Sequence, residues 1–230
     1  MNYEIQGGTL PVVIVHMDPG EKIICEGGGM SWMTPNMKME TSAGATGGGL
    51  GKLIGRMVTG EGIFQNIFTC EGGPGLIAFT SSFPGNIIPV ELAAGQEIIC
   101  QKSAFLAATN GVTLSAYVQK NVGAGFLGGE GFLMQRITGP GLVFLEIDGS
   151  VVEYDLAAGQ AMVVDQGYLA TMDGTCSMDI VVQKGIKNMV FGGDGITNSR
   201  ITGPGKIRLQ TMPAAQVAGC IIPYLPKTNN

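Results

Sequence analysis

The chain has 230 residues, of which 38 are glycine and only 13 % are charged, against about 25 % in an average globular protein. This apolar, charge-poor composition excludes a disordered chain, and the irregular spacing of the glycines excludes collagen. The net charge of −5, with 13 scattered lysines and arginines, argues against broad nucleic-acid binding, because such binding depends on neutralising phosphates.

Short runs with β propensity follow one another along the chain. They show partial alternation of apolar and polar residues, and turn residues separate them about every 8–12 positions, which is typical of a β-sandwich or barrel. The predicted strands are 11–17, 87–92, 112–119, 142–147, 151–156 and 178–183. The few segments with helical character are 52–58, 187–191 and 214–219.

Four motifs recur at one constant offset of 64 residues. The motif LAAGQ at 92–96 recurs at 156–160, VQK at 118–120 at 182–184, GEG at 129–131 as GDG at 193–195, and RITGPG at 136–141 at 200–205. A more diverged third copy lies upstream, at offsets of 75, 69 and 66, and carries a glycine-rich insertion. The sequence therefore predicts three units at 3–80, 81–146 and 147–211, followed by a tail at 212–230.

Units of about 64 residues are too small to bury both faces of their own strands. Because no polar linker separates them, we expect the copies to pack on one another. The predicted fold is all-β: three tandem sandwich- or barrel-like repeats in a pseudo-threefold arrangement, forming one compact domain over residues 1–230.

The five cysteines are odd in number, show no CxxC spacing, and mostly lie in apolar runs. Reduced, buried core thiols are the simplest interpretation, and they fit a cytoplasmic protein. The first residues do not resemble a signal peptide, and no apolar run approaches the roughly 18 residues that a membrane-spanning helix needs.

The single histidine, His16, limits the catalytic possibilities. A Ser-His-Asp or Cys-His site would have to use it, but it follows an apolar run that reads as a strand, where a structural histidine is far more common. A zinc or cupin-like site would need several more ligands of this kind. We therefore predict no catalytic residue, no cofactor and no metal-binding residue.

Three acidic residues occupy equivalent places in the copies: Glu61, Glu130 and Asp194. Around one axis, three carboxylates would repel each other and would need a hard cation such as Ca²⁺ or Mg²⁺. The alternative is that each carboxylate caps a turn by accepting bonds from neighbouring backbone N–H groups, and we favour it.

The glycine-rich stretch near residue 48 does not fit a phosphate-binding loop, because position 46 is threonine and Leu53 replaces the hydroxyl that would hold Mg²⁺. Apolar residues between Leu50 and Val58 have helical spacing, with two basic residues beside them. If exposed, the segment 44–60 would contact a membrane surface or a protein partner; if packed down, it would cover an apolar sheet.

The order of these motifs resembles a known family. A Pro-Gly-Glu turn, a glycine-rich insertion, Gly-Glu-Gly, Gly-Pro-Gly and Leu-Ala-Ala-Gly-Gln are followed by the later copies. From Tyr3 to about Leu225 the chain is similar to the largely uncharacterised family that includes the fungal altered-inheritance-of-mitochondria protein twenty-four. The resemblance implies a fold related to the tryptophan RNA-binding attenuation protein, with three such units in one polypeptide. It carries over no catalytic residues.

Two functions are compatible with these observations. The first is a non-enzymatic scaffold or assembly protein that forms homo-oligomers through wide apolar sheet faces. The second is a binding module for a small molecule or anion, with a pocket between repeats near the two Gly-Pro-Gly turns. In that case Arg136 and Arg200 would contact the anion.

Overall fold

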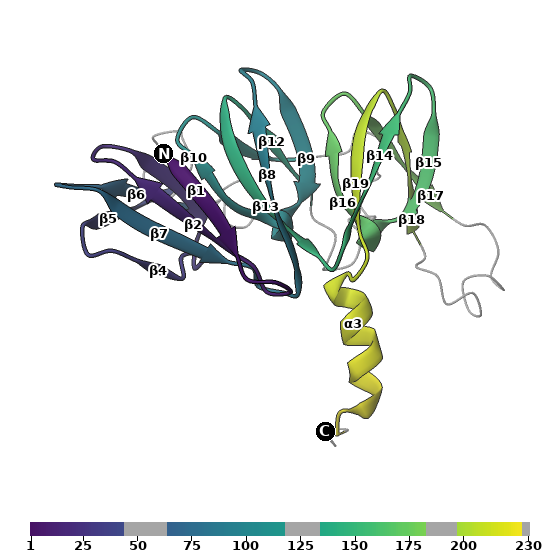
Figure 1. Cartoon of the computed structure of the whole chain (residues 1–230). Coiled ribbons are helices and arrows are strands. Elements are labelled where there is room, and N and C mark those ends of the chain that lie inside the picture. The colour runs from purple at the N-terminus through teal and green to yellow at the C-terminus, as the bar shows by residue number, and fades with distance from the viewer. Residues whose placement is uncertain (44–63, 118–133, 183–196, 227–230) are drawn as a thin grey trace, which may run out of the picture.

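The structure, a computed structural model, describes residues 1–43, 64–117, 134–182 and 197–226. It is all-β with little helix. The described residues consist mainly of antiparallel strands, with one short α-helix near the C-terminus. Figure 1 shows the strands in a row that follows the chain from one end of the molecule to the other. Within the described ranges, no helix is long and apolar enough to cross a membrane.

The strands are most easily followed in three stretches of chain. Residues 1–80 contain β1 (Asn2–Gln6), β2 (Val12–Met17), β3 (Lys22–Glu26), β4 (Trp32–Met33), β5 (Met37–Ala43), β6 (Phe64–Cys70) and β7 (Gly75–Thr80). The next stretch contains β8 (Gly85–Leu92), β9 (Glu97–Gln101), β10 (Phe105–Thr109), β11 (Thr113–Ala116), β12 (Met134–Thr138) and β13 (Gly141–Asp148). The last contains β14 (Val151–Leu156), β15 (Ala161–Asp165), β16 (Leu169–Asp173), β17 (Ser177–Val182), β18 (Thr197–Thr202) and β19 (Gly205–Gln210).

All six predicted strands have counterparts among the described residues, although positions 118–119 and 183 of the predicted ranges lie outside them. The helix predicted at 214–219 is α3 (Ala214–Ile221). The other two predicted helices, 52–58 and 187–191, lie outside the described residues. β9, β10 and β13 begin 64 residues before β15, β16 and β19, the same offset as the sequence motifs. The pseudo-threefold arrangement of the units stays a prediction.

The strands form four sheets, which we call A to D in chain order. Sheet A has the order β1-β2-β7-β4, sheet B β5-β6-β3-β10-β13-β8, sheet C β11-β12-β9-β16-β19-β14 and sheet D β15-β18-β17. Sheets B and C each combine three strands from one stretch of chain with three from the next. The junctions are the antiparallel pairs β3·β10 and β9·β16.

Three hydrophobic cores lie between successive sheets. Each of the junction strands β3 and β9 contributes buried side chains to two of these cores. On β3, Ile23 and Cys25 belong to the first core, whereas Ile24 between them belongs to the second. On β9, Ile98 lies in the second core and Ile99 in the third. This follows from the period of two along a strand, and it explains why these strands read as continuous apolar runs.

The paired repeat motifs are turns that dock on each other. In the LAAGQ turn, the Gln96 side-chain carbonyl accepts a hydrogen bond from Ala93 N (3.0 Å), and the Gln96 backbone carbonyl accepts one from Gly139 N (3.0 Å) of the GPG turn. Gly141 has a φ of 148°, and a Cβ there would lie 2.4 Å from Thr109 Oγ1. The later copy repeats the arrangement, with Gly205 at a φ of 146°. Glycine is therefore required at this position for both space and backbone conformation.

We predict that Ile24→Ala lowers the free energy of unfolding by about 2–5 kcal/mol, because Ile24 is 3 % exposed in the second core. Urea denaturation measures the change. The matched control is Ile5→Ala on β1, where the side chain is 40 % exposed and the expected loss is below about 1 kcal/mol. Equal losses of unfolding free energy at the two positions would contradict the burial of Ile24 in the second core.

Candidate functional site

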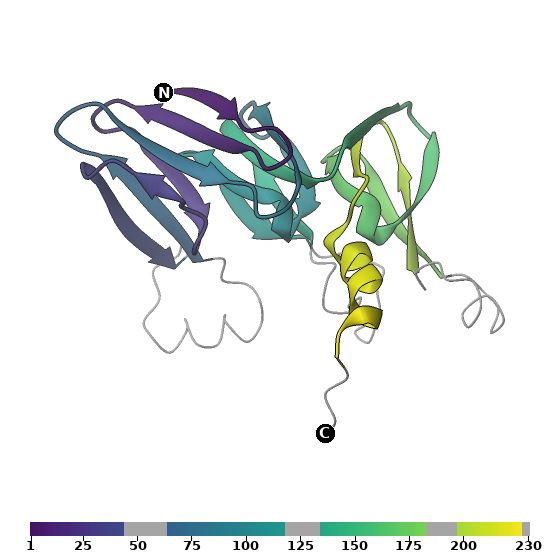
Figure 2. The same ribbon diagram turned by 60° about the horizontal axis from the view of Figure 1, so that its bottom comes forward.

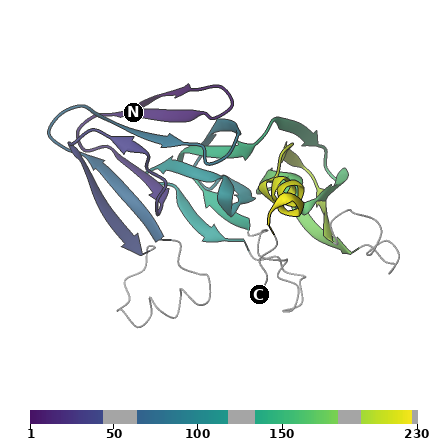
Figure 3. The ribbon, with the colours of Figure 1, turned by 90° about the horizontal axis from the view of Figure 1, so that it is seen from below.

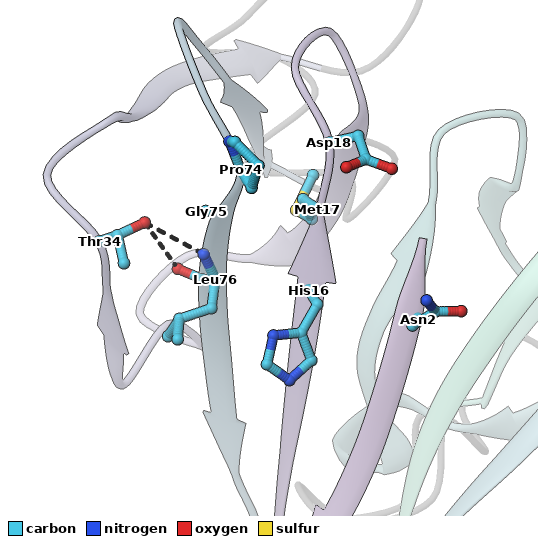
Figure 4. Close-up of a pocket in the computed structure, with 8 residues that line it drawn as sticks. All are labelled: Asn2, His16, Met17, Asp18, Thr34, Pro74, Gly75 and Leu76. Carbon is cyan, nitrogen blue, oxygen red and sulfur yellow. Dashed lines mark hydrogen bonds between the residues drawn. The ribbon is translucent and has the colours of Figure 1, made fainter.

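A shallow depression of about 270 Å³ lies on the first stretch of chain (Figure 4). Its lining residues are Asn2, His16, Met17, Asp18, Thr34, Pro74, Gly75 and Leu76. All of them come from residues 1–80, so this depression is not the pocket between repeats that the sequence suggested.

Two polar side chains of the depression, Thr34 and His16, are engaged with neighbours. Thr34 Oγ1 donates to Asn36 Oδ1 (2.6 Å) and accepts from Leu76 N (3.1 Å), the contact drawn in Figure 4. His16 Nε2 lies 3.2 Å from Glu4 Oε1 on the neighbouring strand, and both side chains are about half exposed. The pKa of Glu4 is lowered, first by a hydrogen bond from Gln6 and then by His16. This geometry gives His16 a surface contact with a carboxylate across two strands, and among the described residues no hydroxyl or thiol hydrogen-bonds to its ring.

The two candidate arginines lie on different sheets. Arg136 on β12 of sheet C pairs with the Glu97 carboxylate, and its guanidinium lies 5.7 Å from the ring centre of Tyr117. Arg200 on β18 of sheet D is exposed, with Asp179 and Val163 opposite it on the flanking strands. The structure does not bring the two arginines together.

The three repeated acids, Glu61, Glu130 and Asp194, lie outside the described residues, and so does the segment 44–60. Among the residues that the structure describes, no group of three or more His, Cys, Asp or Glu side chains is placed to hold a metal ion.

Four of the five cysteines are buried, as predicted, and Cys220 on α3 is exposed. Burial raises the pKa of Cys25 to about 11 and that of Cys100 to about 12. Burial also raises the pKa of Cys176. A thiol with a raised pKa is a poor nucleophile at neutral pH, so these side chains serve packing.

A row of buried polar side chains crosses sheet C, and it was not predicted from the sequence. Gln135, Cys100, Thr171 and Arg208 are directly opposite one another on β12, β9, β16 and β19 and so share one face of the sheet. Gln135 Oε1, Thr171 Oγ1 and Arg208 Nη1 are buried with no hydrogen-bond partner among the described residues. The three residues lie on three different strands, and the linear sequence does not show that these side chains meet.

The apolar C-terminal segment 213–226 is the most exposed non-polar feature of the described chain. α3 has no buried residue, and Ile221, Ile222, Tyr224 and Leu225 are 51 %, 63 %, 88 % and 56 % exposed. Figures 1 and 2 show α3 extending away from the sheets, and Figure 3 looks along its axis.

Comparison with known protein families identifies the family of this chain. The family model described as mitochondrial biogenesis AIM24 matches residues 3–212, nearly the whole of the described body. The chain belongs to the AIM24 family. The resemblance noted from the repeated motifs is thereby confirmed.

Two relatives of this AIM24 chain come from Streptococcus pyogenes. An uncharacterized protein of serotype M6 is 29 % identical over 225 residues, which cover 96 % of this chain and 89 % of the relative. The crystal structure of another S. pyogenes protein superposes with a TM-score of 0.78 at 25 % identity, covering 97 % of this chain and 99 % of that one.

We predict that Thr171→Val raises the free energy of unfolding by about 1–3 kcal/mol, because it removes a fully buried hydroxyl without a partner and keeps the side-chain shape. Thermal or urea denaturation measures it. A loss of stability instead would mean that the hydroxyl holds a buried water or ligand in the row across sheet C.

Proposed function

We propose that this AIM24-family chain is a non-enzymatic scaffold protein that acts by assembling with further copies of itself. The observation that carries the proposal is the C-terminal segment 213–226, which has no charged residue and presents its large apolar side chains to solvent. Exposed apolar surface of this kind marks an interaction site.

The length of α3 supports the same conclusion. A helix of eight residues is not stable in water by itself, and helices in proteins gain most of their stability from packing an apolar face. The start of α3 is held to the body, because Ala214 N donates to Asp148 Oδ2 (3.3 Å), and burial raises the pKa of that carboxyl. Further along, Val217 is half-buried, and the other residues of the helix are exposed. The apolar side chains further along need a surface supplied from outside the described residues, and another copy of the chain supplies it.

The proposed absence of catalysis rests on the chemistry of the described groups. His16 faces a carboxylate on the neighbouring strand, the buried thiols have raised pKa values, and Arg136 is held by Glu97. In the proposal, the chain folds as three β units in one compact domain and works as a cytoplasmic homo-oligomer.

We expect the purified wild-type chain to be a homo-oligomer in native mass spectrometry and in light scattering after size exclusion. The double variant Ile222→Glu, Leu225→Glu places charges on two of the four exposed large apolar side chains and should weaken association at least about tenfold, since charges are unfavourable in a buried interface core.

The matched control is Gln216→Glu, which adds a charge to the same helix at an exposed polar position and should leave the oligomer intact. A strictly monomeric wild-type chain at high micromolar concentration would overturn the scaffold proposal. A stoichiometric small adduct that is lost on denaturation would favour the binding-module function instead.

A further inference from the structure

The two sheet junctions inside the chain share one geometry. At the first, Ala107 and Ala108 on β10 lie opposite Cys25 and Ile24 on β3. At the second, Thr171 and Met172 on β16 lie opposite Cys100 and Ile99 on β9. Each junction pairs three residues, runs antiparallel and joins two three-stranded halves into a six-stranded sheet.

Sheet D is a three-stranded half of such a sheet, and sheet A is a half, β2-β7-β4, with β1 added at its far side. Each ends on a strand that corresponds to one side of the junction. Sheet D ends on β15, which lies 64 residues after β9 and pairs with β18 as β9 pairs with β12. Sheet A ends on β4, which pairs with β7 as β10 pairs with β13.

A shared hydrogen bond fixes the correspondence of β4, β10 and β16 residue by residue. Just after β4, Thr34 Oγ1 accepts from Leu76 N (3.1 Å). At the end of β10, Thr109 Oγ1 accepts from Leu142 N (3.0 Å), and at the end of β16 an Asp173 carboxylate oxygen accepts from Lys206 N (2.8 Å). Counting back from these residues, Met33 corresponds to Ala108 and Met172, and Trp32 to Ala107 and Thr171.

Burial separates the internal junctions from the two ends. Ile24 and Ile99 are 3 % and 1 % exposed, because each reaches into the core of the next stretch of chain. Val163, at the same position of β15, is 52 % exposed. On the other side of the junction, Ala107 and Thr171 are fully buried, whereas Trp32 is 46 % exposed.

Most of the β15 edge also lacks the charged residues or proline that several other outer strands carry. β5 has Lys38 and Glu40, β8 has Pro89 and β14 has Glu153 and Asp155, all of which discourage pairing with another chain. In contrast, the first four residues of β15 are Ala, Met, Val and Val. Among the described residues, no strand pairs with this edge or with the outer edge of β4.

We propose that β15 of one copy pairs antiparallel with β4 of a second copy, and so repeats between chains the junction that the fold makes twice within one. Val163 then lies opposite Met33 and packs into the first core of the second copy. Val164 lies opposite Trp32, whose indole packs against the third core of the first copy. The inference rests on the proposed function only in requiring self-association, and it does not involve α3.

The contact is head-to-tail, because it joins different surfaces of the two copies. Figure 1 places β4 and β15 at opposite ends of the row of strands, so one chain does not pair them with each other. A head-to-tail contact continues from copy to copy, and it gives a ring where the rotation closes and a filament where it does not.

Cysteine cross-linking tests the register. In a Cys220→Ser background, which removes the exposed thiol, the pair Met33→Cys and Val163→Cys should form disulfides between chains under mild oxidation. Opposite residues of an antiparallel pair have Cα atoms about 4.5–5.5 Å apart, within the range that a disulfide spans. Because each chain carries both halves of the contact, non-reducing gels should show a ladder beyond the dimer.

The controls are chosen to separate this ladder from other contacts. Each single-cysteine variant forms at most a dimer. The pair Met33→Cys and Val152→Cys, with the second thiol on the outer strand β14, should give no ladder, although Val152 is 37 % exposed.

A charge substitution gives an independent measurement. Val163→Lys should raise the dissociation constant of the oligomer at least tenfold, whereas Val152→Lys, the same change on β14, should not. Circular dichroism checks that both variants stay folded. A wild-type oligomer that shows no ladder and is insensitive to Val163→Lys would overturn this inference and leave the scaffold function standing. A monomeric wild type would overturn both.

Discussion

The backbone pairing of β3 with β10, and of β9 with β16, is the constraint on which the rest of the structure depends. Each pair covers three residues, yet it turns two separate half-sheets into one continuous sheet. Because side chains alternate across a strand, a continuous sheet between two cores must be apolar on both faces. The motif Ile-Ile-Cys at 23–25 and again at 98–100 meets this requirement, and all six side chains are buried.

Two acidic residues, Glu146 and Glu153, show how charged side chains are accommodated beside the apolar junction strands. Glu146 on β13 of sheet B is buried, and its carboxylate accepts hydrogen bonds from Ser81 Oγ (2.9 Å) and Ser82 N (2.7 Å). On the outer strand β14, Glu153 pairs with Arg208 (2.6 Å), and this hydrogen bond is the largest cause of the lowered pKa of Glu153. These two carboxylates are therefore held by several hydrogen bonds or kept on an outer strand, whereas Glu26 Oε1 on the junction strand β3 is buried with no hydrogen-bond partner among the described residues.

Much of the fold could be predicted from the sequence, and the reasons are local. Period-two alternation and turn residues locate the strands, and the constant offset of LAAGQ and RITGPG locates equivalent turns. What the sequence does not show is which half-sheets join. Pairing of β3 with β10 is a contact between residues about 80 positions apart, and no pattern within either strand specifies its partner.

For the candidate site residues, too, the sequence identifies equivalent positions but not the contacts that they make. Arg136 and Arg200 are equivalent by sequence, but Glu97 holds the first, and its counterpart in the later copy is Ala161, which leaves the second exposed. β1 also could not be predicted, because its five residues are exposed and show no buried face for a pattern to reveal. The row of Gln135, Thr171 and Arg208 depends on three registers at once, so it becomes visible only when the sheet is assembled.

The shared sheets also affect how the chain folds while it is being synthesised. Sheet B needs β13, which ends at Asp148, so the first third of the protein waits for nearly two thirds of the chain to leave the ribosome. During that interval the apolar strand β3 lacks its partner β10. An unpaired strand edge is a template for pairing with another chain, so the order of synthesis determines how long the edge of β3 stays unprotected.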